Sequence, residues 1–153
     1  MLETPHVAVA AAIAAKIPNP FISLPLALAS HFLLERVPHW NPHLMTETKK
    51  FGKPTSASAK IIALDVAASL VTGFSVASAS AQNTSHYFLI LSACLLSVLP
   101  DLVESPYFFL KVRNKFMEKW IAFQGSIQND TTPFIGLATQ AATYALALLI
   151  AFN

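Results

Sequence analysis

The sequence predicts an all-α membrane protein, and three observations support this prediction. Hydrophobic residues make up 54% of the 153 residues, only 12% are charged, and the mean hydropathy is +0.53. These values lie outside the usual balance of a soluble domain. Several apolar runs approach or reach the roughly 20 residues that a helix needs to cross about 30 Å of hydrocarbon. We therefore expect one integral-membrane domain, a polytopic helix bundle, over residues 1–153.

Five apolar segments are expected to be the membrane helices. In chain order they are Leu2–Ile17, Phe21–Val37, Ile61–Ala81, Tyr87–Pro100 and Pro133–Phe152. The third and fifth have the length of a full span. The second and fourth are slightly short, and the first is shorter still, so it crosses at a tilt or only part of the way.

Two regions differ from the spans in composition. Residues 40–60 mix Pro, Lys, Thr and Ser, which is typical of a solvent-exposed loop. Residues 105–128 interleave large apolar side chains with four basic residues, a pattern typical of an amphipathic helix at the membrane surface. Packing of this helix over the bundle is the alternative.

Basic residues indicate the orientation of the chain. The net charge of +2 is too small to favour nucleic acid as a partner, so we interpret these residues as topology signals. Apart from Lys16, the lysines form two groups, at residues 49–60 and residues 111–119. Because Lys and Arg are retained on the cytoplasmic side, both loops and the amino terminus are expected there.

With this topology, ionisable side chains from four segments converge on the inner face of the membrane. They are His6, His31, Glu35, His39, Asp65, Asp101 and Glu104. Ionisable groups are costly near hydrocarbon and persist there where they pair, bind metal or take part in chemistry. A single site is therefore expected to collect them.

The densest group lies at the end of the second segment. His31, Glu35 and His39 are each four residues apart, so a continuous helix would stack them on one stripe. Imidazole nitrogen and carboxylate oxygen are ligands that Zn, Mn or Fe accepts. The structural alternative pairs Glu35 with Arg36 or Lys60 and uses the histidines as hydrogen-bonding groups.

Other segments supply further ligand types. Asp101 and Glu104 follow Pro100, which is expected to redirect the chain, and Asp65 lies within an apolar run. Pro5 suits a first helical turn that would carry His6. We predict a divalent metal site, with Zn as first candidate and Mn or Fe as alternatives. Its predicted ligands are His6, His31, His39, Asp101 and Glu104, with Glu35 and Asp65 as further ligand or general base.

These residues also carry a family resemblance. Thr4-Pro5-His6, the run Ser30–Glu35 followed by Pro38-His39, and Leu99-Pro100-Asp101 resemble the signatures of predicted inner-membrane metal-dependent hydrolases of bacteria and archaea. The middle motif is also similar to one in small membrane relatives of zinc-dependent phospholipase C. The resemblance implies a hydrolase in a prokaryotic inner membrane.

The sequence thus favours a metal-dependent hydrolase that acts on a lipid or phosphate ester, with membrane lipids as its surroundings. A bound metal lowers the pKa of a water molecule, and a carboxylate serves as general base. The competing class is a non-catalytic membrane protein, either a metal or proton transporter element or a scaffold held by a structural polar cluster. A transporter would spread its acids along the depth of the membrane, whereas here they gather at one end.

Overall fold

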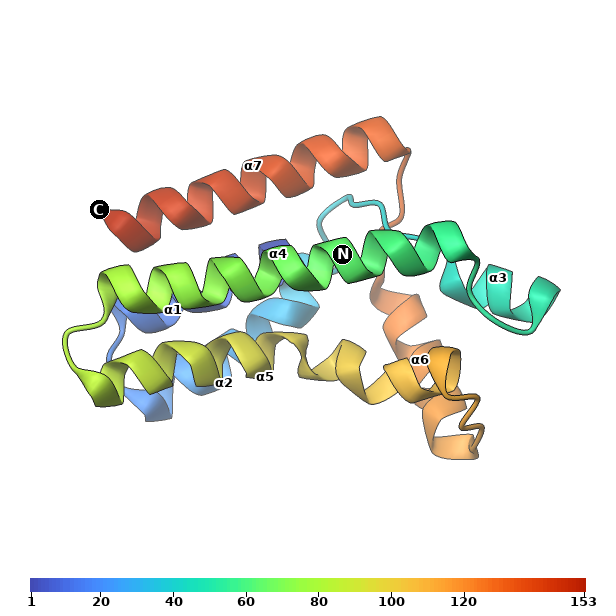
Figure 1. Ribbon diagram of the computed structural model, residues 1–153, viewed down its shortest axis with the longest axis horizontal. Coiled ribbons are helices and arrows are strands. Elements are labelled where there is room, and N and C mark those ends of the chain that lie inside the picture. Colours follow the sequence, from blue (N-terminus) through green and yellow to red (C-terminus); the bar gives the residue numbers. More distant parts are fainter.

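The computed structural model describes residues 1–153 as seven helices without a β-sheet, which confirms the all-α class. The helices are α1 (Glu3–Lys16), α2 (Pro20–Leu34), α3 (Leu44–Phe51), α4 (Ser56–Ser80), α5 (Thr84–Phe109), α6 (Lys115–Ile127) and α7 (Pro133–Phe152) (Figure 1). One isolated parallel bridge joins His39 to Asp130. This bridge ties the segment after α2 to the segment before α7.

Three helices, α4, α5 and α7, are long and apolar enough to cross a bilayer, as expected of a membrane protein. The five predicted spans are not confirmed. At about 1.5 Å of rise per residue, α1 and α2 are only about 21 and 23 Å long, less than the roughly 30 Å hydrocarbon core. The Pro-rich turn between them ends α1 and begins α2, and so limits the length of both helices. In this turn Asn19 caps α2 by accepting a hydrogen bond from Phe21 N at 3.0 Å.

The first segment is the centre of the bundle. Helix α1 contacts α2, α4, α5 and α7, and most of its Ala side chains are buried. Because alanine is small, every face of this helix accepts a neighbouring backbone at close range. The longer helices surround α1 and place exposed Phe and Leu side chains on the outside, as a lipid-facing surface requires.

The expectation of a plain loop over residues 40–60 is wrong. Helix α3 occupies part of it, ending at Gly52 with φ of 75°, and α4 already begins at Ser56. Glu47 organises this region: its carboxylate accepts hydrogen bonds from Thr55 N at 2.7 Å and Ser58 Oγ at 2.6 Å. A local side-chain network therefore orders the region that the composition predicts to be a solvent-exposed loop.

The predicted break at Pro100 is also wrong, because α5 continues through Pro100 and Pro106. A proline cannot donate a backbone hydrogen bond, so Pro106 leaves the Leu102 carbonyl free. Ser105 Oγ donates to that carbonyl at 3.0 Å. The amphipathic helix consequently begins at Lys115 rather than near residue 105. Asn114 caps its start by accepting a hydrogen bond from Met117 N.

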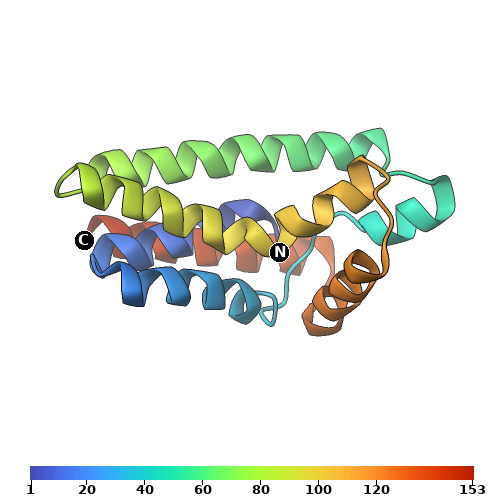
Figure 2. The same cartoon turned by 90° about the horizontal axis from the view of Figure 1, so that it is seen from below.

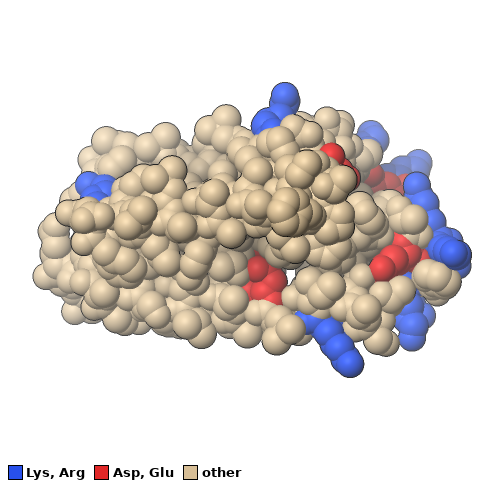
Figure 3. Space-filling model, turned by 90° about the horizontal axis from the view of Figure 1, so that it is seen from above, with Lys and Arg blue, Asp and Glu red and all other residues tan.

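The two halves of the bundle are built differently. Helices α4 and α5 extend beyond α1 and α2 toward one end of the molecule, and the start of α1 lies near its middle (Figure 2). The other end carries α3 and α6, and the Lys and Arg side chains gather there on the face shown in Figure 3. The site lies where these two halves meet.

Candidate metal centre

Three side chains that could bind a metal meet where α1 begins, α2 ends and α5 passes. His6 comes from α1, His31 from α2 and Asp101 from α5, and one possible ligand atom of each lies within 4.8 Å of the other two. Both histidines are fully buried, whereas Asp101 is partly exposed. Two imidazoles and a carboxylate are a suitable donor set for a first-row divalent metal.

His31 is oriented by a backbone carbonyl of α5. Its Nδ1 lies 2.8 Å from the Ser97 carbonyl oxygen, which can only accept, so Nδ1 carries the proton. In the neutral ring, Nε2 then keeps a lone pair, and this atom lies 3.9 Å from Asp101 Oδ1. A backbone acceptor on the far nitrogen is the usual support of a metal-binding histidine.

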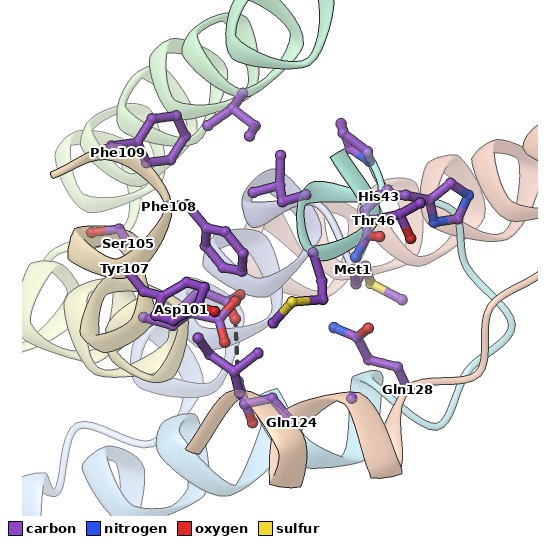
Figure 4. Close-up of a pocket in the computed structure, with 18 of the residues that line it drawn as sticks. Met1, His43, Thr46, Asp101, Ser105, Tyr107, Phe108, Phe109, Gln124 and Gln128 are labelled. Atoms are coloured by element: carbon purple, nitrogen blue, oxygen red, sulfur yellow. Dashed lines mark hydrogen bonds between the residues drawn. The ribbon is translucent and has the colours of Figure 1, made fainter. Parts of the chain in front are cut away.

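Gln124 of α6 connects these two groups. Its side-chain nitrogen lies 3.2 Å from His31 Nε2 and donates to Asp101 Oδ1 at 3.2 Å; Figure 4 shows the contact with Asp101. Its side-chain oxygen is buried without a hydrogen-bond partner. Gln124 could not be predicted from the sequence, because nothing local marks a glutamine 93 positions away from His31 as its neighbour.

His6 stacks on His31 with ring centroids 4.4 Å apart and contacts Glu35 on its other side. Its Nε2 lies 3.1 Å from Glu35 Oε1, and its Nδ1 is buried without a partner. When Nε2 donates to Glu35, Nδ1 keeps the lone pair that a metal requires. Burial opposes ionisation of Glu35, but the hydrogen bond with His6 and the positive amino group of Met1 hold the pKa of Glu35 below its usual value.

His39 does not share a helical stripe with His31 and Glu35, because α2 ends at Leu34. That prediction is wrong, since Pro38 interrupts helical hydrogen bonding at this point. Two backbone hydrogen bonds hold His39 instead: its N donates to Asn129 O at 3.1 Å, and its O accepts from Thr131 N at 3.0 Å. His39 Nε2 still lies 3.5 Å from Glu35 Oε2, and burial lowers the pKa of His39.

Gly136 of α7 permits this placement of His39. A Cβ atom at Gly136 would lie 2.4 Å from Trp40 N and 2.7 Å from the His39 carbonyl carbon. Gln140, one turn further along α7, donates to Trp40 O at 2.8 Å. The start of α7 therefore fixes the backbone that carries His39.

Asp65 of α4 caps α1. Its carboxylate accepts hydrogen bonds from Glu3 N at 2.5 Å, Thr4 N at 3.2 Å and Thr4 Oγ1 at 2.6 Å. A carboxylate at a helix N-terminus satisfies free N–H groups and interacts favourably with the helix dipole. The structure thus gives Asp65 a structural role, and its catalytic role stays a prediction.

A cavity of about 660 Å³ opens beside Asp101, between the start of α1 and helices α3, α4, α5 and α6 (Figure 4). Glu3 and Glu104 line it together with Asp101, and each has one buried carboxylate oxygen without a hydrogen-bond partner. Glu3 was not expected at the site. Its spacing of three residues from His6, which puts both on one face of α1, is the signal that could have found it.

The structure therefore brings His6, His31 and Asp101 together, with Glu35 and His39 adjoining and Glu104 in the cavity. Comparison with known proteins adds no relative: no family model, no curated protein and no solved structure matches this chain.

Proposed function

We propose that this chain is a metal-dependent hydrolase of a prokaryotic inner membrane that acts on a lipid or phosphate ester. The observation that carries the proposal is the position of His6, His31 and Asp101, where one possible ligand atom of each residue lies within 4.8 Å of the other two, beside an open cavity. A divalent metal held there, Zn in the first instance, would lower the pKa of a bound water and polarise the scissile group.

The cavity supplies the other groups that hydrolysis needs. Glu104 has a buried oxygen without a partner, so its carboxylate is free to accept a proton from an attacking water. Glu3 lies on the same cavity wall and is a second candidate for this role. Glu35 instead lies behind His6, where its contact orients the ring.

Features of the cavity wall favour a lipid substrate. Val66 of α4 and Leu102 and Phe109 of α5 line the cavity, and all three apolar side chains are exposed. When α4 and α5 cross the membrane, this edge of the cavity faces hydrocarbon. A substrate with an acyl chain could then lie along the apolar edge with its polar group toward Asp101.

The proposed topology puts the α3 and α6 end in the cytoplasm, together with the amino terminus. Cysteine-accessibility labelling in membranes tests this orientation. We expect Lys53→Cys and Lys115→Cys to be labelled from the cytoplasmic side and Lys16→Cys from the opposite side. Labelling of Lys53→Cys and Lys115→Cys from opposite sides would contradict the proposed topology.

Metal analysis of the purified protein, together with hydrolysis assays, tests the proposed function. We expect bound divalent metal and metal-dependent hydrolysis of a fluorescent phospholipid or of bis(p-nitrophenyl) phosphate. His31→Ala is expected to lose hydrolysis and the metal held by His6, His31 and Asp101 while keeping its helical content, since membrane helices satisfy their own backbone hydrogen bonds. His43→Ala is the matched control, because His43 lines the cavity but is exposed. A wild type without bound metal, and without stabilisation on metal titration, would contradict the proposal.

A scaffold is the second candidate, and one observation favours it. Gln124 already links His31 to Asp101 through its side-chain nitrogen, as a purely structural polar network would. In that case His31→Ala would lower thermal stability to the same extent with and without added metal.

A further inference from the structure

Glu35 and His39 face each other through two atoms that have no hydrogen-bond partner. Glu35 Oε2 and His39 Nε2 are 3.5 Å apart, and the two side chains are 1% and 0% exposed. His6, His31 and Asp101 form the metal group described above, and these two atoms are not part of it. A buried polar atom without a partner is unfavourable, so a pair of them requires an explanation.

When the His39 ring is neutral, His39 Nε2 and Glu35 Oε2 are both hydrogen-bond acceptors. Its Nδ1 lies 2.8 Å from the Val37 carbonyl oxygen, so Nδ1 carries the proton and Nε2 has the lone pair of a neutral imidazole. The carboxylate of Glu35 is also only an acceptor. Two acceptors that face each other in a buried site repel unless a proton or a metal cation lies between them.

The distance between these atoms suits a metal ion. Zinc binds imidazole nitrogen and carboxylate oxygen at about 2.0 to 2.2 Å, so two ligands at a tetrahedral angle are about 3.4 Å apart. The observed 3.5 Å agrees with that spacing. The backbone that carries His39 is fixed by Asn129, Thr131 and Gly136, so the distance is set by the fold.

We propose that Glu35 and His39 bind a second divalent cation, next to the one assigned to His6, His31 and Asp101. Glu35 connects the two positions: Oε1 contacts His6, and Oε2 binds the second ion. Water or substrate oxygen completes its coordination, as in paired-metal sites that act on phosphate esters. This inference rests on the proposed function, because it extends the same site.

Titration of metal-free protein with Co²⁺, followed by visible absorption, tests the second position. The wild type is expected to bind two equivalents, His39→Ala one, and the matched control His43→Ala two. His31→Ala should keep the Glu35 and His39 position and therefore still bind one. Metal analysis after Zn²⁺ loading should give the same stoichiometries.

The possible results separate the two proposals. One equivalent in both the wild type and His39→Ala would overturn the second position and leave the first, with His39 then protonated and paired with Glu35. No binding by the wild type would remove both proposals. The wild-type stoichiometry decides between these results even if a variant fails to fold.

Discussion

His86 and His39 are both buried histidines, yet their ring nitrogens have different surroundings. In the half of the bundle around α1, His86 Nε2 lies 2.9 Å from Ala14 O, and Nδ1 accepts a hydrogen bond from Gln82 N at 3.2 Å. At the meeting point of the two halves, His39 Nε2 has no partner. The first histidine completes a structural network, whereas the second presents an unused lone pair.

The same difference holds for the two regions as a whole. The buried side-chain atoms without a hydrogen-bond partner belong to Glu3, His6, Glu35, His39, Thr48, Glu104 and Gln124. All seven residues lie at or beyond the start of α1, toward the α3 and α6 end. Because native structures leave few buried polar groups unpaired, their concentration in one region supports the metal site proposed above.

The largest expected effect comes from removing the centre of this polar group. Glu35→Ala leaves the buried Met1 amino group and His6 without their shared partner, and loss of one member of a buried charged group costs about 3 to 5 kcal/mol. His86→Ala, the matched change in the other half, should cost about 1 to 3 kcal/mol through the hydrogen bonds it loses. Chemical unfolding in detergent measures both, and equal losses would contradict the proposed difference between the regions.

A smaller effect is expected from the backbone that supports the site. Gly136→Ala puts a methyl group against Trp40 and should cost about 1 to 3 kcal/mol, as overpacking does. Gly125→Ala is the matched control, because nothing lies within 4 Å of a Cβ there and Ala is favoured in a helix by up to about 1 kcal/mol. Thermal unfolding compares the two variants, and unchanged stability in Gly136→Ala would show that the close contact does not hold the His39 segment.

Sequence reasoning could predict the helical class and the residue types of the site, because both depend on local composition. Apolar length identified α4 and α7, and the rarity of ionisable groups in apolar segments identified His6, His31 and Asp101. Helix boundaries were less accurate. Pro100 and Pro106 proved compatible with a continuous α5, since a side-chain hydroxyl satisfies one of the freed carbonyls.

The supporting residues could not be found in this way. Ser97, Gln124, Asn129 and Gly136 reach the site from positions far along the chain, and each acts through a backbone group, an amide or the absence of a side chain. Single-sequence patterns carry no signal for such non-local contacts. The sequence also did not predict that α1 lies at the centre of the bundle, because alanine-rich segments are equally suited to lipid-facing and buried positions.

A loss of stability of intermediate size is expected from a change at Asp65. Asp65→Asn keeps the shape of the side chain but removes the charge at the start of α1, which should cost about 0.5 to 2 kcal/mol. Because its oxygens are engaged by Glu3 and Thr4, we expect metal binding to remain. Metal analysis and unfolding of the same sample measure both quantities. Loss of metal with unchanged stability would instead support the predicted catalytic or ligand role of Asp65.

The smallest effect concerns Glu47, a polar group at the α3 and α6 end that has all its partners. Hydrogen bonds from Ser58, from Thr55 and from the Thr55 backbone lower the pKa of Glu47 below its ordinary value of 4.5. A group whose pKa is lower in the folded state stabilises the protein above its unfolded pKa, and this stabilisation is lost as the pH falls through the folded pKa.

Glu47→Gln should therefore reduce the unfolding midpoint at pH 7 by an amount equivalent to about 1 kcal/mol or less, as for other solvent-screened contacts. The difference from the wild type should shrink as the pH falls below the ordinary pKa of 4.5 and through the lower pKa of folded Glu47, with metal binding unchanged throughout. Loss of metal in Glu47→Gln would contradict the proposed difference. It would show that a polar residue at this end of the bundle can affect metal binding even when it has all its hydrogen-bond partners.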